Sequence, residues 1–569
     1  MSDVKRTFLT GMLIAGVLMI IPWYYNALGI SNNDQSDSEV MALPEQLPQN
    51  NTQISEKKTA PIKQTLSVKK TYQEFQIINN NFTATVSNLS GGSVVEYVLN
   101  SDESQYVGGY DDAGLYRDAT PVSLILNTSN LCAPCVQFQD LNGNTSVVDE
   151  PFQLISPAIN SSNVFIVEKD SPAVLVFRVS LNNLEITKTL TITYNKFVIN
   201  HSVDVKTLNS NSPSAIGFVW DKGIRNTEYN VVDEISYSLA SIGSNKNIEN
   251  ITLSPSSIED RVNLKSYDDA DWVALRNKYF IMAMVPDAPM KASYSAETFA
   301  LNSNNLVPSF SSSILNNGDS NLNCDIYLGP LDLESINELD SYLDRIMNFG
   351  WFILQPFSRS ILWLLKFLHG FGINYGVILV LFAFIIRFIT GPLTKKSYES
   401  SQKMQSLQPQ IQKLQEKFKK DPQRLNQETI KLYKESGTNP LGGCLPMLLQ
   451  MPLLFSLFIV FRSTIEFRGA PFFGWISNLS QPDTIINLPI NIPLYGDQIA
   501  FLPILLGITM FLSQKMSMAS MDPKQKPFMY IMSVFFYLIF NSFPSGLNLY
   551  YVVYNLLNYL QQKSLKKAA

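Results

Sequence analysis

The feature that most constrains this chain is the stretch from Tyr375 to Leu393, which reads YGVILVLFAFIIRFITGPL. It is long enough and apolar enough to span a bilayer as a helix. Its single charge, Arg387, lies about two helical turns, roughly 12 Å, before Lys395. A cation held in hydrocarbon is costly. Arg387 is therefore either a flanking arginine that marks the cytoplasmic end of the span or a residue that faces a water-filled cavity or a partner.

The charge of the chain changes sign along its length. The 569 residues carry a net charge of −5. Residues 346–569 hold 21 Lys and Arg against nine Asp and Glu, whereas residues 7–345 hold 20 against 38. This asymmetry indicates two compartments, with the basic half on the cytoplasmic side of a membrane. We predict a multi-pass membrane protein with both termini in the cytoplasm and a large exported domain.

The N-terminus predicts a membrane anchor followed by a tether. Two basic residues precede an apolar run that ends in three aromatic residues at 23–25. The run fills a span, which favours an uncleaved signal anchor, while a cleaved signal peptide is the alternative. We predict a cytoplasmic N-terminus at 1–6, a transmembrane signal anchor at 7–25 and, from its polar composition, a flexible linker at 26–65.

Residues 66–342 show the period-two alternation of strands. Clear examples are Ala173–Val179, Leu184–Tyr194 and Phe197–Val205, separated by clusters of turn residues. Such a pattern predicts a large, mostly antiparallel β-sandwich, and its acidic balance fits an exported domain. No catalytic constellation stands out in this domain. His201 lies in a strand pattern, so we interpret it as a structural residue.

The cysteines and histidines predict no metal site or cofactor. Cys132 and Cys135 form a CAPC motif without the βαβ pattern of a redox enzyme, which leaves a local disulfide or two free thiols. Cys324 and Cys444 are interpreted as structural. The chain has only two histidines, too few for a His-rich metal site.

Residues 343–371 predict an amphipathic helix that lies along the outer membrane interface. A span here would place the following basic loop outside and break the positive-inside rule. Trp351 and Trp363 would anchor this helix. The second transmembrane helix then covers 372–393.

Residues 394–440 predict a cytoplasmic helical hairpin with ten basic and five acidic residues. Apolar residues recur at the spacing of a coiled-coil seam, and Asp421-Pro422 makes the turn. The seam consists of Met404, Leu407, Ile411, Leu414 and Phe418. The hairpin is either a landing surface for a ribosome, RNA or an emerging chain, or a solvated loop that only fixes topology.

Four further apolar segments complete a predicted fold of six spans with a five-helix core. The predicted spans are transmembrane 3 at 441–462, transmembrane 4 at 498–516, transmembrane 5 at 527–541 and transmembrane 6 at 546–562, followed by a basic tail at 563–569. The last two apolar runs are short, and a short hairpin can be accommodated by local thinning of the bilayer.

A polar stripe on the last span is the candidate partner of Arg387. Its residues share one helix face, at spacings of three and four. They are Asn548, Tyr551, Asn555, Asn558 and Gln562. Together with Gln450 they predict either interhelical hydrogen bonding or a wet, positively charged groove. None of the five C-terminal spans contains an acidic residue. At about 4 Å and an effective dielectric of about 20, a charge pair gains roughly 4 kcal/mol before desolvation, enough to attract an anionic client without holding it.

Four motifs together resemble the YidC-type membrane protein insertases, in the form with a large periplasmic domain. They are Asn439–Cys444 (NPLGGC), Gln450–Pro452 (QMP), Phe543–Leu547 (FPSGL) and Arg387–Thr394 (RFITGPLT). The resemblance implies a five-helix core whose groove opens to cytoplasm and lipid, with an arginine at the position of Arg387. It also implies a β-supersandwich fold for the exported domain, similar to sugar mutarotases but without their activity.

The resemblance further implies what the protein acts on. It implies an insertase and chaperone without covalent chemistry that releases nascent membrane proteins sideways into the lipid bilayer. The implied partners are the Sec translocon and translating ribosomes, with no small-molecule substrate. By the same resemblance a hydrophobic slide for clients lies on the third and fifth spans, for which we select Met451, Phe455, Ile539 and Phe540.

Two other classes of function are weighed against this one. A solute or ion transporter would require ion-coupling carboxylates and internal repeats, and neither is visible. An enzyme, either an intramembrane hydrolase or an exported carbohydrate enzyme, would need a base near a nucleophile such as Ser545. No His or Lys lies near Ser545 in the sequence.

Overall fold

The structure is a computed structural model, and it describes residues 72–568 with internal gaps. The gaps are 102–103, 112–113, 127–131, 158–162, 182–183, 208–212, 222, 253–261, 303–304, 340, 420, 438–444, 493–494 and 519–525. The predicted N-terminal anchor, the linker, the NPLGGC motif and Cys444 therefore lie outside the described residues.

The described strands of residues 74–330 form the predicted strand-rich domain, in three main sheets. Their pairings are antiparallel except that of β1 with β10. The nine-stranded sheet has the order β16-β15-β18-β19-β22-β13-β12-β11-β9. Its strands are β9 (Gln153–Ser156), β11 (Ala173–Leu181), β12 (Leu184–Ile192), β13 (Val198–Thr207), β15 (Leu239–Ser244), β16 (Asn247–Ile251), β18 (Trp272–Arg276), β19 (Phe280–Pro286) and β22 (Asn321–Pro330).

The other sheets of the described chain are smaller. The six-stranded sheet, β17-β20-β21-β14-β7-β8, consists of β7 (Cys135–Gln139), β8 (Thr145–Val147), β14 (Ala215–Trp220), β17 (Val262–Ala270), β20 (Met290–Asn302) and β21 (Asn305–Leu315). The five-stranded sheet, β10-β1-β2-β3-β6, consists of β1 (Glu74–Ile78), β2 (Phe82–Ser87), β3 (Ser93–Leu99), β6 (Ser123–Leu126) and β10 (Val164–Ile166). Two further pairs are β4 (Val107–Tyr110) with β5 (Tyr116–Pro121), and β23 (Thr484–Ile492) with β24 (Gly496–Ala500).

Alternation along β12 shows why this sequence folds into strands. Ile186, Leu190 and Ile192 point into the core, as period two requires. Lys188 occupies the same face and is fully buried, where its Nζ donates to the carbonyls of Ser90 (3.1 Å) and Pro134 (3.3 Å). Burial lowers the pKa of Lys188 to about 7. The two carbonyls accept hydrogen bonds from the Lys188 amino group, which a polar group buried in an apolar core requires.

His201 and the cysteines are structural elements of the same domain. His201 is buried on β13 and lies edge-on to Phe218, with its ring centroid 5.8 Å away. Burial, and the nearby Lys188, lower the pKa of His201 well below its ordinary value. Cys132 and Cys135 form a disulfide, which settles the alternative left open above, and Cys324 is a buried free thiol.

The C-terminal region is helical. Its helices in the described residues are α4 (Gln355–His369), α5 (Tyr375–Lys417), α6 (Pro422–Glu435), α7 (Leu445–Ser463), α8 (Phe501–Met518), α9 (Lys526–Phe540) and α10 (Ser545–Ala568). Short helices in the rest of the described chain are α2 (Val231–Ile235), α3 (Leu333–Asn337), η1 (Ser104–Tyr106), η2 (Leu343–Ile346) and η3 (Ile465–Phe467). The predicted second span and the first helix of the predicted hairpin are one continuous helix, α5, and the turn before α6 ends with Asp421 as its N-cap.

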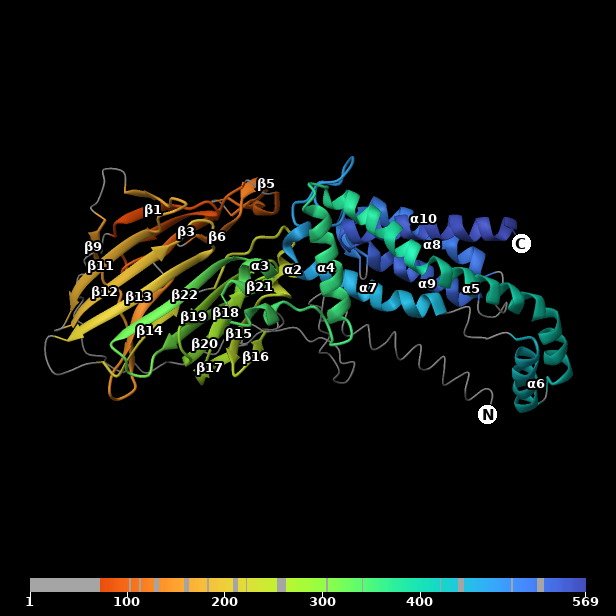
Figure 1. The fold of residues 1–569 in the computed structure, drawn as a ribbon, viewed down its shortest axis with the longest axis horizontal. Coiled ribbons are helices and arrows are strands. Elements are labelled where there is room, and N and C mark those ends of the chain that lie inside the picture. Colours follow the sequence, from red (N-terminus) through yellow and green to blue (C-terminus); the bar gives the residue numbers. More distant parts are fainter. Residues whose placement is uncertain are drawn as a thin grey trace, which may run out of the picture.

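By length and composition, one helix within the described ranges, Tyr375–Met404, is long and apolar enough to cross a membrane. Shorter apolar helices cover Gln450–Ser463 and Phe501–Lys515. The strand-rich domain and the helical bundle lie end to end, and α4 crosses the bundle axis between them (Figure 1). Ile361, Leu362 and Leu365 of α4 are buried. The opposite face of α4 exposes apolar side chains, including the stacked rings of Trp363 and Phe367.

Candidate functional site

Helix α5 directs Arg387 into the bundle. Leu379 and Ala383 precede Arg387 by two turns and one turn, and both are fully buried. An exposed apolar stripe of α5 lies on its other side and includes Leu381, Phe384 and Phe388. Arg387 is accordingly only 8% exposed, on the same side of α5 as these buried residues.

Arg387 contacts neutral groups. One guanidinium nitrogen donates to the Gln561 side-chain oxygen on α10, and another lies 3.4 Å from the hydroxyl of Thr394. The Tyr554 ring centroid is 5.8 Å from the guanidinium carbon. Nε has no hydrogen-bond partner, and among the residues that the structure describes no carboxylate forms an ion pair with Arg387. The charge is therefore held by dipoles and an aromatic face rather than by a counter-ion.

Gln561 was not singled out from the sequence. It lies on the α10 face that carries Tyr550 and Tyr554, at spacings of four and seven residues. The predicted polar stripe occupies a neighbouring face, roughly a quarter turn away at 100° per residue. The spacing from Tyr554 to Gln561 was visible, but only the packing of α10 against α5 shows that this face meets Arg387.

The predicted stripe residues have separate partners. Asn548 is fully buried and donates to the carbonyls of Phe540 (3.1 Å) and Phe543 (3.3 Å), which holds the turn between α9 and α10. Asn558 donates to the hydroxyl of Ser513 on α8 at 2.8 Å and accepts from Gln562 at 3.3 Å. These bonds are interhelical or local packing contacts, one of the two alternatives for the stripe.

The remaining predicted groove residues lie on α7 and α10. Tyr551 is buried, and its ring lies 5.8 Å from that of Phe540. Asn555 is half-buried on α10, and Gln450 is half-buried on α7. The Tyr550 hydroxyl lies close enough to Gln450 to interact with it, without reaching hydrogen-bonding geometry.

Of the sixteen buried polar atoms without a protein partner in the described chain, six lie on α5, α7 and α10. They are Arg387 Nε, Ser456 Oγ, Asn548 Oδ1, Tyr550 Oη, Tyr551 Oη and Gln562 Oε1. Buried polar groups in proteins are normally paired with protein or with water. Water in the bundle would pair these atoms, and polar groups of a bound polypeptide segment would be able to replace that water.

The residues selected for a hydrophobic slide differ in exposure. Met451 and Phe455 on α7 and Ile539 on α9 are half-buried. Phe540 is only 7% exposed and lies inside the bundle instead of on an open apolar surface. Its ring packs against Phe543 at 5.0 Å because α9 ends there and the chain turns back into α10.

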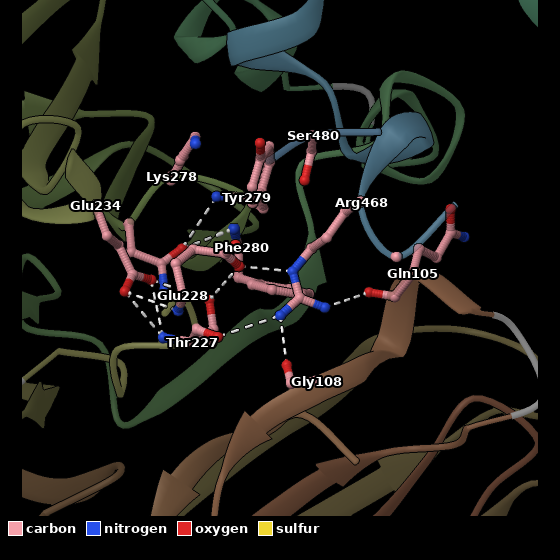
Figure 2. Close-up of polar contacts among 12 residues, drawn as sticks. Gln105, Gly108, Thr227, Glu228, Glu234, Lys278, Tyr279, Phe280, Arg468 and Ser480 are labelled. Atoms are coloured by element: carbon pink, nitrogen blue, oxygen red, sulfur yellow. Dashed lines mark hydrogen bonds and ion pairs between the residues drawn. The ribbon is translucent and has the colours of Figure 1, made fainter. Parts of the chain in front are cut away.

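A second polar cluster joins the bundle to the strand-rich domain (Figure 2). Arg468 follows η3 and is 1% exposed. Its Nε donates to Glu228 at 2.6 Å, and its other nitrogens donate to the carbonyls of Gln105, Gly108 and Thr227 at 2.6, 2.6 and 3.2 Å. A charged side chain so deeply buried is tolerated because its hydrogen-bonding capacity is filled.

Glycine is required immediately after Arg468. A Cβ atom on Gly469 would lie 2.0 Å from the Ser104 carbonyl oxygen, and Gly469 has φ +63°. This close approach brings the loop after η3 against η1, so that the Arg468 guanidinium can enter the strand-rich domain.

Two further carboxylates complete the junction. Asp233 on α2 pairs with Lys278 at 2.8 Å and with Arg462 of α7 at 2.5 Å. Burial would raise the pKa of Asp233, but the two cations lower it to about 2. Glu234 is fully buried and accepts from Thr227 N and Glu228 N. Its burial, and the charge of Glu228, raise the pKa of Glu234 to about 8.

No metal centre emerges from the described residues, which contain no group of three or more His, Cys, Asp and Glu able to hold an ion. The fold and the two polar clusters define a membrane protein whose strand-rich domain is fixed by buried ion pairs to one end of an apolar helical bundle.

Comparison with known proteins gives the family. Residues 367–569 match the family model of the 60Kd inner membrane protein, and residues 153–364 match that of the YidC periplasmic domain. The chain belongs to the YidC family of inner membrane proteins with a periplasmic domain. The strand-rich domain is therefore periplasmic. The family assignment confirms the resemblance found in the motifs.

Curated relatives carry the same family name. The membrane protein insertase YidC of Chlorobium phaeovibrioides is 40% identical over 359 residues, which cover 60% of each chain. That of Chlorobaculum tepidum is 34% identical over 391 residues, 67% of this chain and 66% of the relative. The chain thus spans about 60% of the length of the relatives it matches. Their named function, insertion, is not an enzymatic one.

A solved structure is similar at low sequence identity. A crystal structure of an active YidC insertase with its first transmembrane domain resolved is 19% identical to this chain. The match covers 86% of this chain and 92% of that one, with a TM-score of 0.34.

Proposed function

We propose that this protein is a membrane protein insertase and chaperone. It receives nascent hydrophobic segments in a positively charged hydrophilic groove and releases them laterally into the inner membrane, alone or with the Sec translocon. The observation that carries this proposal is Arg387, a buried cation with neutral partners, in a bundle whose helices α5, α7 and α10 carry further buried polar atoms without protein partners.

The groove in this proposal extends from Arg387 to α7 and α10. Its proposed lining is Arg387, Gln450, Tyr551 and Asn555, to which the contacts around Arg387 add Thr394 and Gln561. Asn548 and Asn558, also predicted for the groove, make the packing contacts described above. An acidic or polar client segment would be attracted by the guanidinium, since its present partners are neutral. The absence of a fixed counter-ion means that a client does not have to displace one.

The apolar part of a client would slide past α7 and α9. The half-buried Met451, Phe455 and Ile539 form this slide in our proposal, with Phe540 supporting it from beneath. Helix α9 has 15 residues, so it rises only about 22 Å, less than the ~30 Å of a bilayer core. A bilayer thinned around α9 would shorten the path of the client's polar end.

The proposed topology has six spans, a five-helix core and both termini in the cytoplasm. In this topology the hairpin formed by the end of α5 and by α6 lies in the cytoplasm, where its basic surface would contact a translating ribosome. Nascent membrane proteins and Sec translocon components are the other proposed partners.

Site-specific photo-crosslinking to a nascent membrane protein stalled on its ribosome tests this function. Probes replace Gln450 and Ile539, and a probe at the lipid-exposed Phe388 serves as the matched control. We expect crosslinks at the first two positions that appear at one nascent-chain length and disappear after integration. Crosslinks equal to those of the control at every length would contradict a groove and slide.

A further inference from the structure

The connection between α7 and α8 presents a largely apolar surface, on which the one exposed charged residue among those described is Asp497 of β24. From Gly469 to Gly496 the only charged residue is Asp483, which is buried. Ile476 and Leu479 are buried, but six large apolar side chains of this segment are exposed. They are Phe473, Trp475, Ile485, Ile486, Ile490 and Ile492. Phe473 is 82% and Ile490 65% exposed. Contiguous exposed apolar side chains of this kind mark an interaction surface or a membrane contact.

The segment is held rigidly against the bundle. Asn541, at the end of α9, donates to the carbonyls of Tyr495 (2.8 Å) and Gln498 (2.6 Å) and accepts from Ala500 N at 3.0 Å. Asp483 accepts from Leu502 N at 2.8 Å and from Trp475 Nε1 at 3.1 Å. The apolar surface is therefore a fixed part of the bundle.

These contacts place the segment at the periplasmic end of the membrane region. Asn374, the N-cap of α5, donates to the Pro471 carbonyl at 2.7 Å. Asn374 follows α4, which crosses the bundle on the side of the periplasmic domain (Figure 1). The exposed Trp363 and Phe367 of α4 therefore lie at the same end of the bundle as the β23–β24 hairpin.

The length of α9 sets the depth of the hairpin. Helix α9 begins at Lys526, and its 15 residues rise only about 22 Å before Asn541 holds the hairpin. Helix α9 is therefore shorter than the ~30 Å hydrocarbon core of a bilayer. Either the base of the hairpin lies below the headgroups of the periplasmic leaflet, or the bilayer is thinner around α9. In both cases the isoleucines of β23 contact acyl chains.

The backbone limits this depth. β23 and β24 form a two-stranded sheet, so each strand has an outer edge of unpaired backbone groups, which hydrocarbon does not tolerate. Asn487 and Pro489 interrupt the apolar pattern of β23, and Pro489 removes one edge N–H. The hairpin therefore fits the interface between headgroups and acyl chains, where Trp475 suits an aromatic belt.

We propose that Phe473, Trp475, Ile485, Ile486 and Ile490 form a lipid anchor, seated in the periplasmic leaflet of the membrane at its interface. The anchor couples the outer end of α9 to the bilayer, in addition to the contact made by α4. Its occupant is lipid, because the surface lies at the same end of the bundle as the exposed apolar face of α4, and because Asp497 is its one exposed charge, whereas a soluble partner surface would carry a charged rim.

The test measures the surroundings of a nitroxide label in the full chain reconstituted in phospholipid nanodiscs. Labels are attached to Ile490→Cys, to Phe367→Cys on α4, and to Leu141→Cys, an 88% exposed position in the periplasmic domain. Collision with oxygen reports lipid, and collision with a water-soluble nickel chelate reports water. The unsubstituted chain, treated with the same label, gives the background from native cysteines.

We expect the ratio of oxygen to nickel collisions at position 490 to match that at position 367 and to exceed that at position 141 several-fold. A ratio at 490 equal to that at 141 would show the hairpin in water and overturn the lipid anchor. Protection of the 490 label from both reagents would show a protein contact, such as a second copy of the chain, and would overturn it as well.

Discussion

Arg468 and Arg387 are both buried arginines, yet their surroundings are opposite. Arg468, at the junction between the periplasmic domain and the bundle, has Glu228 at 2.6 Å and four carbonyl oxygens around its guanidinium. Arg387, inside the bundle, has a glutamine, a threonine and an aromatic ring. One arginine is saturated with permanent partners, and the other retains an unpartnered Nε.

The contrast shows how burial of the same side chain can serve two purposes. Removal of one partner of a buried ion pair is strongly destabilising, because it leaves an uncompensated charge in a low dielectric. Such a pair fixes the position of two domains. A buried cation with only neutral partners keeps its attraction for anions, because no fixed carboxylate cancels its field. The junction therefore locks the architecture, while the bundle keeps a charge available.

The largest expected effect is at the junction. Arg468→Ala leaves Glu228 buried without its cation and should cost about 3–5 kcal/mol of stability. Denaturant unfolding of the full chain in detergent measures this loss. Arg117→Ala, which removes an exposed ion pair with Asp111, is the control and should cost about 0–1 kcal/mol. Equal losses of unfolding free energy in the two variants would show that the buried ion pair at the junction contributes no more than an exposed one.

The pH dependence of the junction gives the next largest effect. The pKa of Asp233 is lowered from 3.8 to about 2, so its ionised form stabilises the folded protein at every pH above about 4. This stabilisation is lost as pH falls through about 2, and it amounts to roughly 2 kcal/mol by linkage. Unfolding of the full chain between pH 5 and pH 2 measures it.

Asp233→Asn is the matched variant for the pH experiment. It removes the titrating group, so the variant should be less stable at neutral pH and show a smaller loss between pH 5 and pH 2. A pH profile identical to that of the unsubstituted protein would mean that other carboxylates control acid unfolding.

Charge reversal in the bundle should act on function rather than on folding. With Arg387→Glu we expect insertion of clients with acidic translocated segments to fall about tenfold, equivalent to roughly 1.4 kcal/mol. Arg387→Lys keeps the charge and should retain most activity. Insertion into inverted membrane vesicles, scored by protease protection of the client, measures both. Normal insertion of acidic clients by a folded Arg387→Glu protein would refute the electrostatic part of the proposal.

The smallest effect should come from Gln561→Ala. This change removes one neutral partner of Arg387, a contact worth about 0.5–1.5 kcal/mol in stability. Because the positive charge remains, insertion of acidic clients should stay within about twofold of normal, within the range of a single hydrogen bond. The same vesicle assay measures insertion of acidic clients by this variant. A loss as large as that of Arg387→Glu would show that Gln561 positions the guanidinium for its client.

Local patterns were sufficient to predict a strand-rich domain followed by a helical region. Period-two alternation predicted a strand-rich domain, and it includes Lys188 among the inward positions of β12. Four motifs at fixed positions predicted the family, and the family models confirm it. These inferences succeed because side-chain periodicity and turn chemistry depend on neighbours a few residues away, which a sequence displays directly.

The partners of the buried charges were decided only by tertiary structure. Glu228 and Arg468 are 240 residues apart, and Arg387 and Gln561 are 174 apart. Neither pair has a local pattern, because a side chain meets its partner through the docking of whole elements. The sequence of α5 left open whether Arg387 points inward, and the packing of the bundle decided it. The packing of α5, α8 and α10 decided which face of α10 contacts Arg387 and whether that face carries a carboxylate.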